Sequence, residues 1–152
     1  MLPDAKGFAG LVLVRQLAPN ARVIVVSAKS DHETVALAGV LGASGFVDKA
    51  SGLGEIVQSL GRIMDGVFVF PQRGPAVHQA LLAAADAIAV LTPAQLRVMI
   101  AVADGRSNKQ IAHDLGLSDA TVKVHVSASL KKLCVPNRAR AILIMQPLTS
   151  SD

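Results

Sequence analysis

Apolar residues between positions 91 and 145 recur at intervals of three and four, the spacing that places them along one side of an α-helix. Gly105, Gly116 and Pro136 interrupt this pattern, and a glycine just after a helix or a proline beyond it is a common stop signal. The interruptions divide the stretch into four helical segments. We therefore predict a compact all-α unit of four helices around one small core.

Residues suited to capping stand before three of these segments. Thr92 with Gln95, and Ser107 with Gln110, form two capping boxes, in which each side chain satisfies a backbone N–H at the start of the helix. Ser118 can cap the third helix with its hydroxyl oxygen. The sequence thus predicts helix starts near positions 92, 107 and 118.

The helices predicted over 107–115 and 118–133 are joined by a tight turn at Gly116, where a left-handed residue is favoured. The apolar stripe of the second helix consists of Val122, Val126, Leu130 and Leu133. The opposite face carries lysines, a hydroxyl and small side chains, which suit the major groove of DNA because lysine reaches guanine acceptors or phosphates and small apolar groups can touch thymine methyls. The alternative is a plain helical hairpin with a solvated charged face.

The first part of the chain alternates helical periods with short β-branched runs. Helices are predicted over 4–17, 31–41 and 51–64, strands over 21–28 and 44–49, and a last extended piece over 66–70. The run at 21–28 has a continuous β-branched stretch at its centre, which is typical of a strand buried on both faces of a sheet. Strands and helices that alternate at this spacing predict a doubly wound parallel α/β fold.

The chain therefore divides into an α/β part over 1–70, a linker over 71–90 that ends in a connecting helix, and the helical unit over 91–147. Residues 1–90 hold seven Lys or Arg and seven Asp or Glu, whereas residues 91–152 hold eight and four. Because the whole positive surplus lies in the helical unit, we expect a polyanionic partner there.

Composition excludes several classes of protein. A chain that is 51% hydrophobic and 17% charged is too apolar to be disordered. Its one cysteine, Cys134, cannot form an internal disulfide. The apolar runs at 8–14 and 80–91 are too short for a signal or a membrane span, so we expect a cytoplasmic protein with no membrane partner. No nucleophile with a base, no metal cluster and no phosphate-binding glycine loop is recognised, so we do not expect an enzyme.

The segments LTPAQ, DGRSNKQIA, LSDATVKVHVSASLKKL and VPNRARAI, from position 91 to about 145, resemble the helix-turn-helix domain of NarL/LuxR-type (FixJ-type) bacterial transcription regulators. The resemblance implies that the 118–133 helix is the recognition helix and that the final helix, 137–145, is where two copies pair on DNA. It places Lys123, Val124 and Ser127 at the base-contacting positions.

Charge or a hydroxyl near the helix starts and along the groove-facing side makes Lys109, Thr121, Lys131 and Lys132 our candidates for phosphate contacts. Two positions depart from the family pattern. Gln95 stands where the family usually has an acidic residue, and Cys134 stands where it often has glycine.

The segments LPDAKG, VIVVSA and LGASGFVDKA resemble the C-terminal half of a response-regulator receiver domain, which has a flavodoxin-like fold. The resemblance places Ser27, Phe46 and Lys49 at the receiver's switch positions. Ser27 and Lys49 are 22 residues apart (49 minus 27), as in the family. A hydroxyl and an ammonium at adjacent strand ends can converge on one phosphoryl group, and the alternative is a buried serine and a solvated lysine.

A receiver also uses an acidic pair that holds Mg²⁺ and an aspartate that accepts phosphate. Both would lie before Met1, so we expect no phosphoacceptor, metal site or cofactor in this chain. Mg²⁺ and a histidine kinase partner would belong only to a longer form.

The truncated receiver would show an unpaired strand edge and uncovered helix faces, which predicts a homodimer through exchange or pairing of 1–70. The predicted function is a DNA-binding transcription regulator of the two-component type. The alternative is a protein-interaction module that uses the truncated receiver without specific DNA readout.

Overall fold

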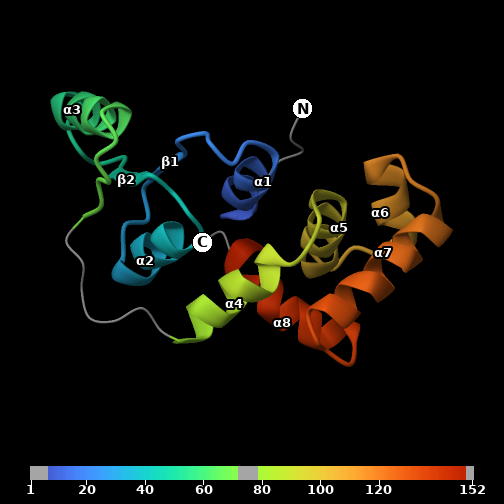
Figure 1. Cartoon of the computed structure of the whole chain (residues 1–152). Coiled ribbons are helices and arrows are strands. Elements are labelled where there is room, and N and C mark those ends of the chain that lie inside the picture. The colour runs from blue at the N-terminus through green and yellow to red at the C-terminus, as the bar shows by residue number, and fades with distance from the viewer. Residues whose placement is uncertain (1–6, 72–78, 150–152) are drawn as a thin grey trace.

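The computed structural model describes residues 7–71 and 79–149. Its elements follow in the order α1 (Ala9–Leu17), β1 (Ile24–Ser27), α2 (His32–Val40), β2 (Gly45–Asp48), α3 (Leu53–Met64), α4 (Gln79–Ala89), α5 (Pro93–Ala103), α6 (Asn108–Leu115), α7 (Asp119–Lys132) and α8 (Arg138–Thr149). Figure 1 shows α1 to α3 and the two strands on one side and α5 to α8 on the other. None of the helices in these two ranges is long and apolar enough to cross a membrane.

The two strands form the small parallel sheet expected of a doubly wound fold. β1 and β2 pair in parallel, with Val25 opposite Phe46, and α2 forms the connection between them. The extended piece predicted over 66–70 is reduced to one bridge between Val69 and Gly45. The fold class is therefore confirmed, with a sheet of two strands in the described part of the chain.

The prediction that β1 is buried on both faces is wrong. Val26 is 44% exposed, and its neighbours Ile24 and Val25 are only partly buried. In the described residues β1 has a paired strand on one side only, and its other edge is open. An apolar composition indicates that a strand is suited to burial, but other segments must pack against it to bury it.

The helix starts of the second half are confirmed in atomic detail. The Thr92 hydroxyl accepts from the Gln95 N–H at 3.3 Å and the Gln95 side chain accepts from the Thr92 N–H at 3.0 Å. Ser107 and Gln110 repeat this reciprocal pair. Gly116 lies in the left-handed region with φ of 65°, which lets α6 end and α7 begin three residues later, at Asp119.

The main core cluster joins the two halves of the chain. Leu96, Val122 and Met145 are fully buried in it, and α1 adds Val12 and Leu13. Two hydrogen bonds reinforce this contact: the Phe8 N–H donates to the Leu148 carbonyl at 2.9 Å, and the Gln16 side-chain amide donates to the Leu91 carbonyl at 2.8 Å. The α/β part and the helical unit therefore share buried surface through α1.

The last helix continues beyond its predicted end at Met145. α8 runs to Thr149 and contains Pro147. Ala141, Met145 and Leu148 are all buried, so the apolar spacing of the helix continues into its last turn and packs it against the core. A smaller second cluster, which includes Leu11 and Phe46, lies between α1, α2 and β2.

Cys134, just beyond α7, has a positive φ of 54°. A side chain in this conformation costs roughly 1 to 2 kcal/mol, and the unfolded-state entropy of a glycine offsets about half of that. We expect Cys134→Gly to raise the free energy of unfolding by about 0.5 to 1 kcal/mol in urea titrations. Cys134→Ala removes the thiol but keeps the strained backbone, so it serves as the control and should show no gain.

Candidate nucleic-acid interface

The inner face of α7 is fixed by the core of the helical unit. Val122 and Leu133 are buried, Val126 and Leu130 are partly buried, and the predicted apolar stripe is confirmed. Ser129 is also fully buried, which the sequence did not indicate. Its hydroxyl donates to the His125 carbonyl at 2.7 Å, a bond that serine commonly makes one turn back and that satisfies it inside the core.

The outer face of α7 carries the three predicted base-contacting residues. Lys123, Val124 and Ser127 are exposed, and the Val124 side chain is 67% accessible. These side chains come from consecutive turns of one helix and lie on its solvent side. The arrangement offers a cation, a hydroxyl and a small apolar group on a rigid support.

The ammonium of Lys123 already has a partner within the helix. Its Nζ lies 3.0 Å from Oδ2 of Asp119, one turn earlier. Both side chains are largely solvated, so an ion pair of this kind is worth well under about 1 kcal/mol. A phosphate or a guanine could therefore displace the carboxylate at little cost.

The four candidate phosphate contacts lie in different surroundings. Lys109 on α6 and Lys131 on α7 are exposed, and neither has an ion pair among the described residues. The Thr121 hydroxyl lies 2.8 Å from the Ser118 hydroxyl that caps α7. These three side chains can reach a DNA backbone without unfolding any element.

Lys132 is exposed, but its ammonium is held by two acceptors of the protein. Its Nζ donates to the Val90 carbonyl at 3.1 Å and to Oε1 of Gln95 at 2.9 Å, which ties the end of α7 to the start of α5. Gln95 therefore provides the oxygen at a position where an acidic residue is usual in the family. One ammonium hydrogen of Lys132 remains for a phosphate, so it is a weaker candidate than Lys109 or Lys131.

Two of the three receiver positions lie at neighbouring strand ends, because Ser27 ends β1 and Lys49 directly follows β2. The Lys49 N–H donates to the Ser27 carbonyl at 2.8 Å, and the Ser27 hydroxyl accepts from the Lys29 N–H at 3.0 Å. Phe46 is buried in the second cluster, and Lys49 is exposed. Hydrogen bonds from the Ser30 hydroxyl and the Ala50 N–H lower the pKa of Asp48 beside them. The roles of Ser27, Phe46 and Lys49 as switch residues stay predictions.

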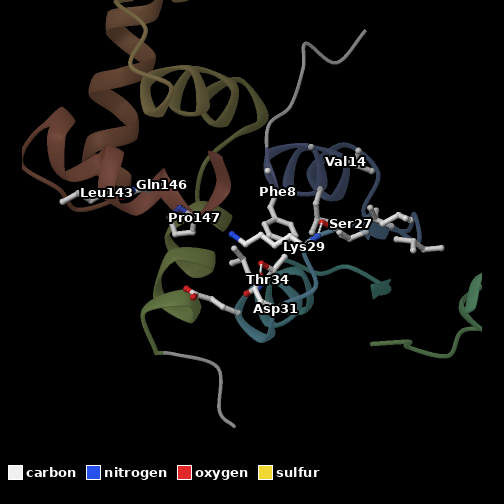
Figure 2. Close-up of a pocket in the computed structure, with 18 residues that line it drawn as sticks. Phe8, Val14, Ser27, Lys29, Asp31, Thr34, Leu143, Gln146 and Pro147 are labelled. Carbon is white, nitrogen blue, oxygen red and sulfur yellow. Dashed lines mark hydrogen bonds between the residues drawn. The ribbon is translucent and has the colours of Figure 1, made fainter. Parts of the chain in front are cut away.

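A cavity of about 720 Å³ lies along the open edge of β1 (Figure 2). Residues 23–27 line it consecutively, which shows that the backbone edge of the strand faces it, because side chains of a strand alternate between its faces. Figure 2 shows Phe8 and Thr34 beside the hollow and Pro147 of α8 across from them.

The chain is similar in sequence to known regulatory proteins. Residues 89–145 match the family described as bacterial regulatory proteins, luxR family. The chain is 36% identical to the glycerol metabolism activator of Pseudomonas putida, over 93% of this chain and 68% of that protein. It is 30% identical to the nitrate/nitrite response regulator protein NarL of Escherichia coli K12, over 92% of this chain and 67% of NarL.

Among solved structures, RcsB of Salmonella enterica serovar Typhimurium bound to promoter rprA matches with a TM-score of 0.45 and 18% identity. That match covers 90% of this chain and 65% of the RcsB chain. The chain thus spans about two thirds of the length of the relatives it matches.

Proposed function

Because the chain belongs to the luxR family of bacterial regulatory proteins, we propose that it is a transcription regulator that reads duplex DNA with α7 in the major groove. The observation that carries this proposal is the division of α7 into a buried face and an exposed face with Lys123, Val124 and Ser127. A helix held in this way can enter the groove as a rigid body, because the side chains it presents are not needed for its own packing.

Each candidate side chain has a part in the proposed complex. Lys123 would donate to guanine acceptors, Val124 would touch a thymine methyl, and Ser127 would bond a base edge. Lys109, Thr121 and Lys131 would bind phosphates and set the register of the helix, with Lys132 adding its one remaining hydrogen.

The regulator would act as a dimer. α8 buries Ala141 and Met145 but exposes Arg140 and Leu143, which leaves one face for a second copy on DNA. Two recognition helices related by a two-fold axis would read half-sites about one helical turn apart. In the first half, Ser27, Phe46 and Lys49 would form the switch of a receiver-like α/β unit.

The test is the salt dependence of DNA affinity. We expect binding of a dimer to a fluorescent duplex to weaken on the order of 10³-fold or more between about 50 and 200 mM salt, because each neutralised phosphate releases counterions. Lys109→Ala and Lys131→Ala should each lower the slope of log affinity against log salt by about one unit per copy. Lys29→Ala, which removes an exposed lysine of the α/β half, is the matched control and should leave the slope unchanged.

The second candidate is a protein-interaction module, which is favoured by the open edge of β1 and the cavity beside it. Such a protein would show little DNA affinity and no steep salt slope. If the DNA affinity of the wild-type chain did not depend on salt concentration, the protein-interaction module would be favoured over the DNA-binding regulator.

A further inference from the structure

α6 is a short helix that depends on its neighbours for its position. Its eight residues are too few for a stable isolated helix in water, and among them only Ile111 and Ala112 are buried. Lys109, a candidate phosphate contact, stands in the first turn of α6 and is exposed. The placement of that turn therefore decides where the Lys109 ammonium can reach.

The first turn of α6 is held by Arg138, the first residue of α8. The guanidinium Nη1 of Arg138 donates to Oδ1 of Asn108 at 3.0 Å, and its Nη2 donates to the carbonyl of Arg106. These two acceptors belong to the residues on either side of Ser107, which caps α6. Because a guanidinium is planar and rigid, one side chain fixes both flanks of the cap at once.

The side chain of Arg106 attaches the same loop a second time. Its Nη1 lies 2.7 Å from Oδ2 of Asp114 near the end of α6, and its Nη2 lies 3.5 Å from Oδ2 of Asp104 at the end of α5. The loop between α5 and α6 is thus tied to both of the helices that it joins. Arg138 ties it to a third helix, α8, which follows much later in the chain.

Arg138 is itself attached to a fixed part of the protein. The Arg140 N–H donates to Oδ1 of Asn137 at 3.0 Å at the start of α8, and Ala141 is fully buried in the main core. The Arg138 residue is half-buried, and both of its terminal nitrogens donate to protein oxygens. It is therefore less suited to bind a phosphate than the exposed Lys109.

We propose that Arg138 is a positioning residue for DNA binding, which holds the first turn of α6 so that Lys109 reaches a backbone phosphate. This inference rests on the proposed function, in which Lys109 binds phosphate and α8 pairs with a second copy. The contact joins these two roles, because it starts on α8 and ends on the turn that carries Lys109. The spacing of two paired α8 helices then sets the spacing of the two Lys109 side chains along the duplex.

A double-mutant cycle separates positioning from direct contact. Fluorescence anisotropy measures the affinity for a scrambled duplex across a salt series for the wild-type full chain, Arg138→Gln, Lys109→Ala and the double variant. We expect each single variant to lose about three- to tenfold in affinity and about one unit of salt slope per copy, because both remove the same phosphate contact. The double variant should lose no more than about twofold beyond Lys109→Ala.

Three further variants serve as controls. Arg138→Lys keeps the charge but has one terminal nitrogen in place of two, so it should lose most of what Arg138→Gln loses. Asn108→Ala removes one acceptor without changing any charge and should lower the affinity in the same direction. Arg62→Gln removes an exposed arginine from α3 and should leave affinity and slope unchanged. Circular dichroism checks the fold of each variant, and Asn108→Ala takes the place of Arg138→Gln in the cycle if the latter does not fold.

Additive losses in the cycle would overturn the proposal, because a further unit of slope lost in the double variant would mean that Arg138 binds a phosphate of its own. Wild-type affinity of Arg138→Lys would also overturn it, because charge alone would then suffice. In both cases the proposed function would stand, since the wild type still binds DNA in a salt-dependent way. A wild-type chain without salt-dependent DNA binding would overturn the proposed function and this inference together.

Discussion

Lys123→Ala is expected to weaken binding to a specific operator about 10- to 100-fold, because a lysine that donates to guanine acceptors contributes roughly 1 to 3 kcal/mol of discrimination. Binding to random duplex should fall much less, so the ratio of specific to random affinity should shrink. The measurement is anisotropy titration with an operator selected from a random pool and with a scrambled duplex of equal length.

Two further variants make this result specific. Asp119→Asn removes the carboxylate that holds the Lys123 ammonium at 3.0 Å, so it should tighten binding to both duplexes several-fold. Lys109→Ala, on α6, should weaken both duplexes alike, as expected of a phosphate contact. If Lys123→Ala also weakened both alike, Lys123 would be reassigned to the DNA backbone and the sequence readout would lie elsewhere on α7.

Leu96→Ala is expected to lower the free energy of unfolding by about 2 to 5 kcal/mol, the usual range for removing a fully buried leucine side chain. Leu96 has no exposed surface and lies in the cluster that joins α5 to α1, α6, α7 and α8. Leu17→Ala is the control, because Leu17 is largely exposed at the end of α1 and its truncation should cost about 0.5 kcal/mol or less. Urea titration followed by circular dichroism measures both.

The same titration reports on the contact between the two halves. Because Val12 and Leu13 of α1 belong to the same cluster as Leu96, the loss of that core should unfold the α/β part together with the helical unit. Two separated transitions in the wild type would contradict a shared core.

Features that depend on a few neighbouring residues were predictable from the sequence. The capping boxes at Thr92 and Ser107 act over three residues, and the turn at Gly116 depends on one residue that tolerates a positive φ. The exposed face of α7 follows from the spacing of its apolar stripe. The same spacing predicts that Lys123, Val124 and Ser127 face outward, whereas their expected contact with bases comes from the resemblance to the family.

Features that depend on distant segments were not predictable. The partners of Lys132, Val90 and Gln95, lie about forty residues away in the chain. The exposure of Val26 depends on whether another strand lies beside β1, and the burial of Ser129 depends on how α7 rotates against α5. A pattern along one element shows which face is apolar, but not which segment covers it.

Neighbouring residues of α1 pack into both cores of the protein. Leu11 lies in the cluster with Phe46, whereas Val12 and Leu13 lie in the cluster with Leu96 and Met145. A ligand that binds at the β1 edge and shifts α1 must change the affinity of the helical unit for its own ligand. Because thermodynamic linkage is reciprocal, a ligand of the helical unit must change the affinity of the β1 edge by the same factor. Slower hydrogen exchange at the Phe8 amide when DNA binds α7 would be the signature of that linkage.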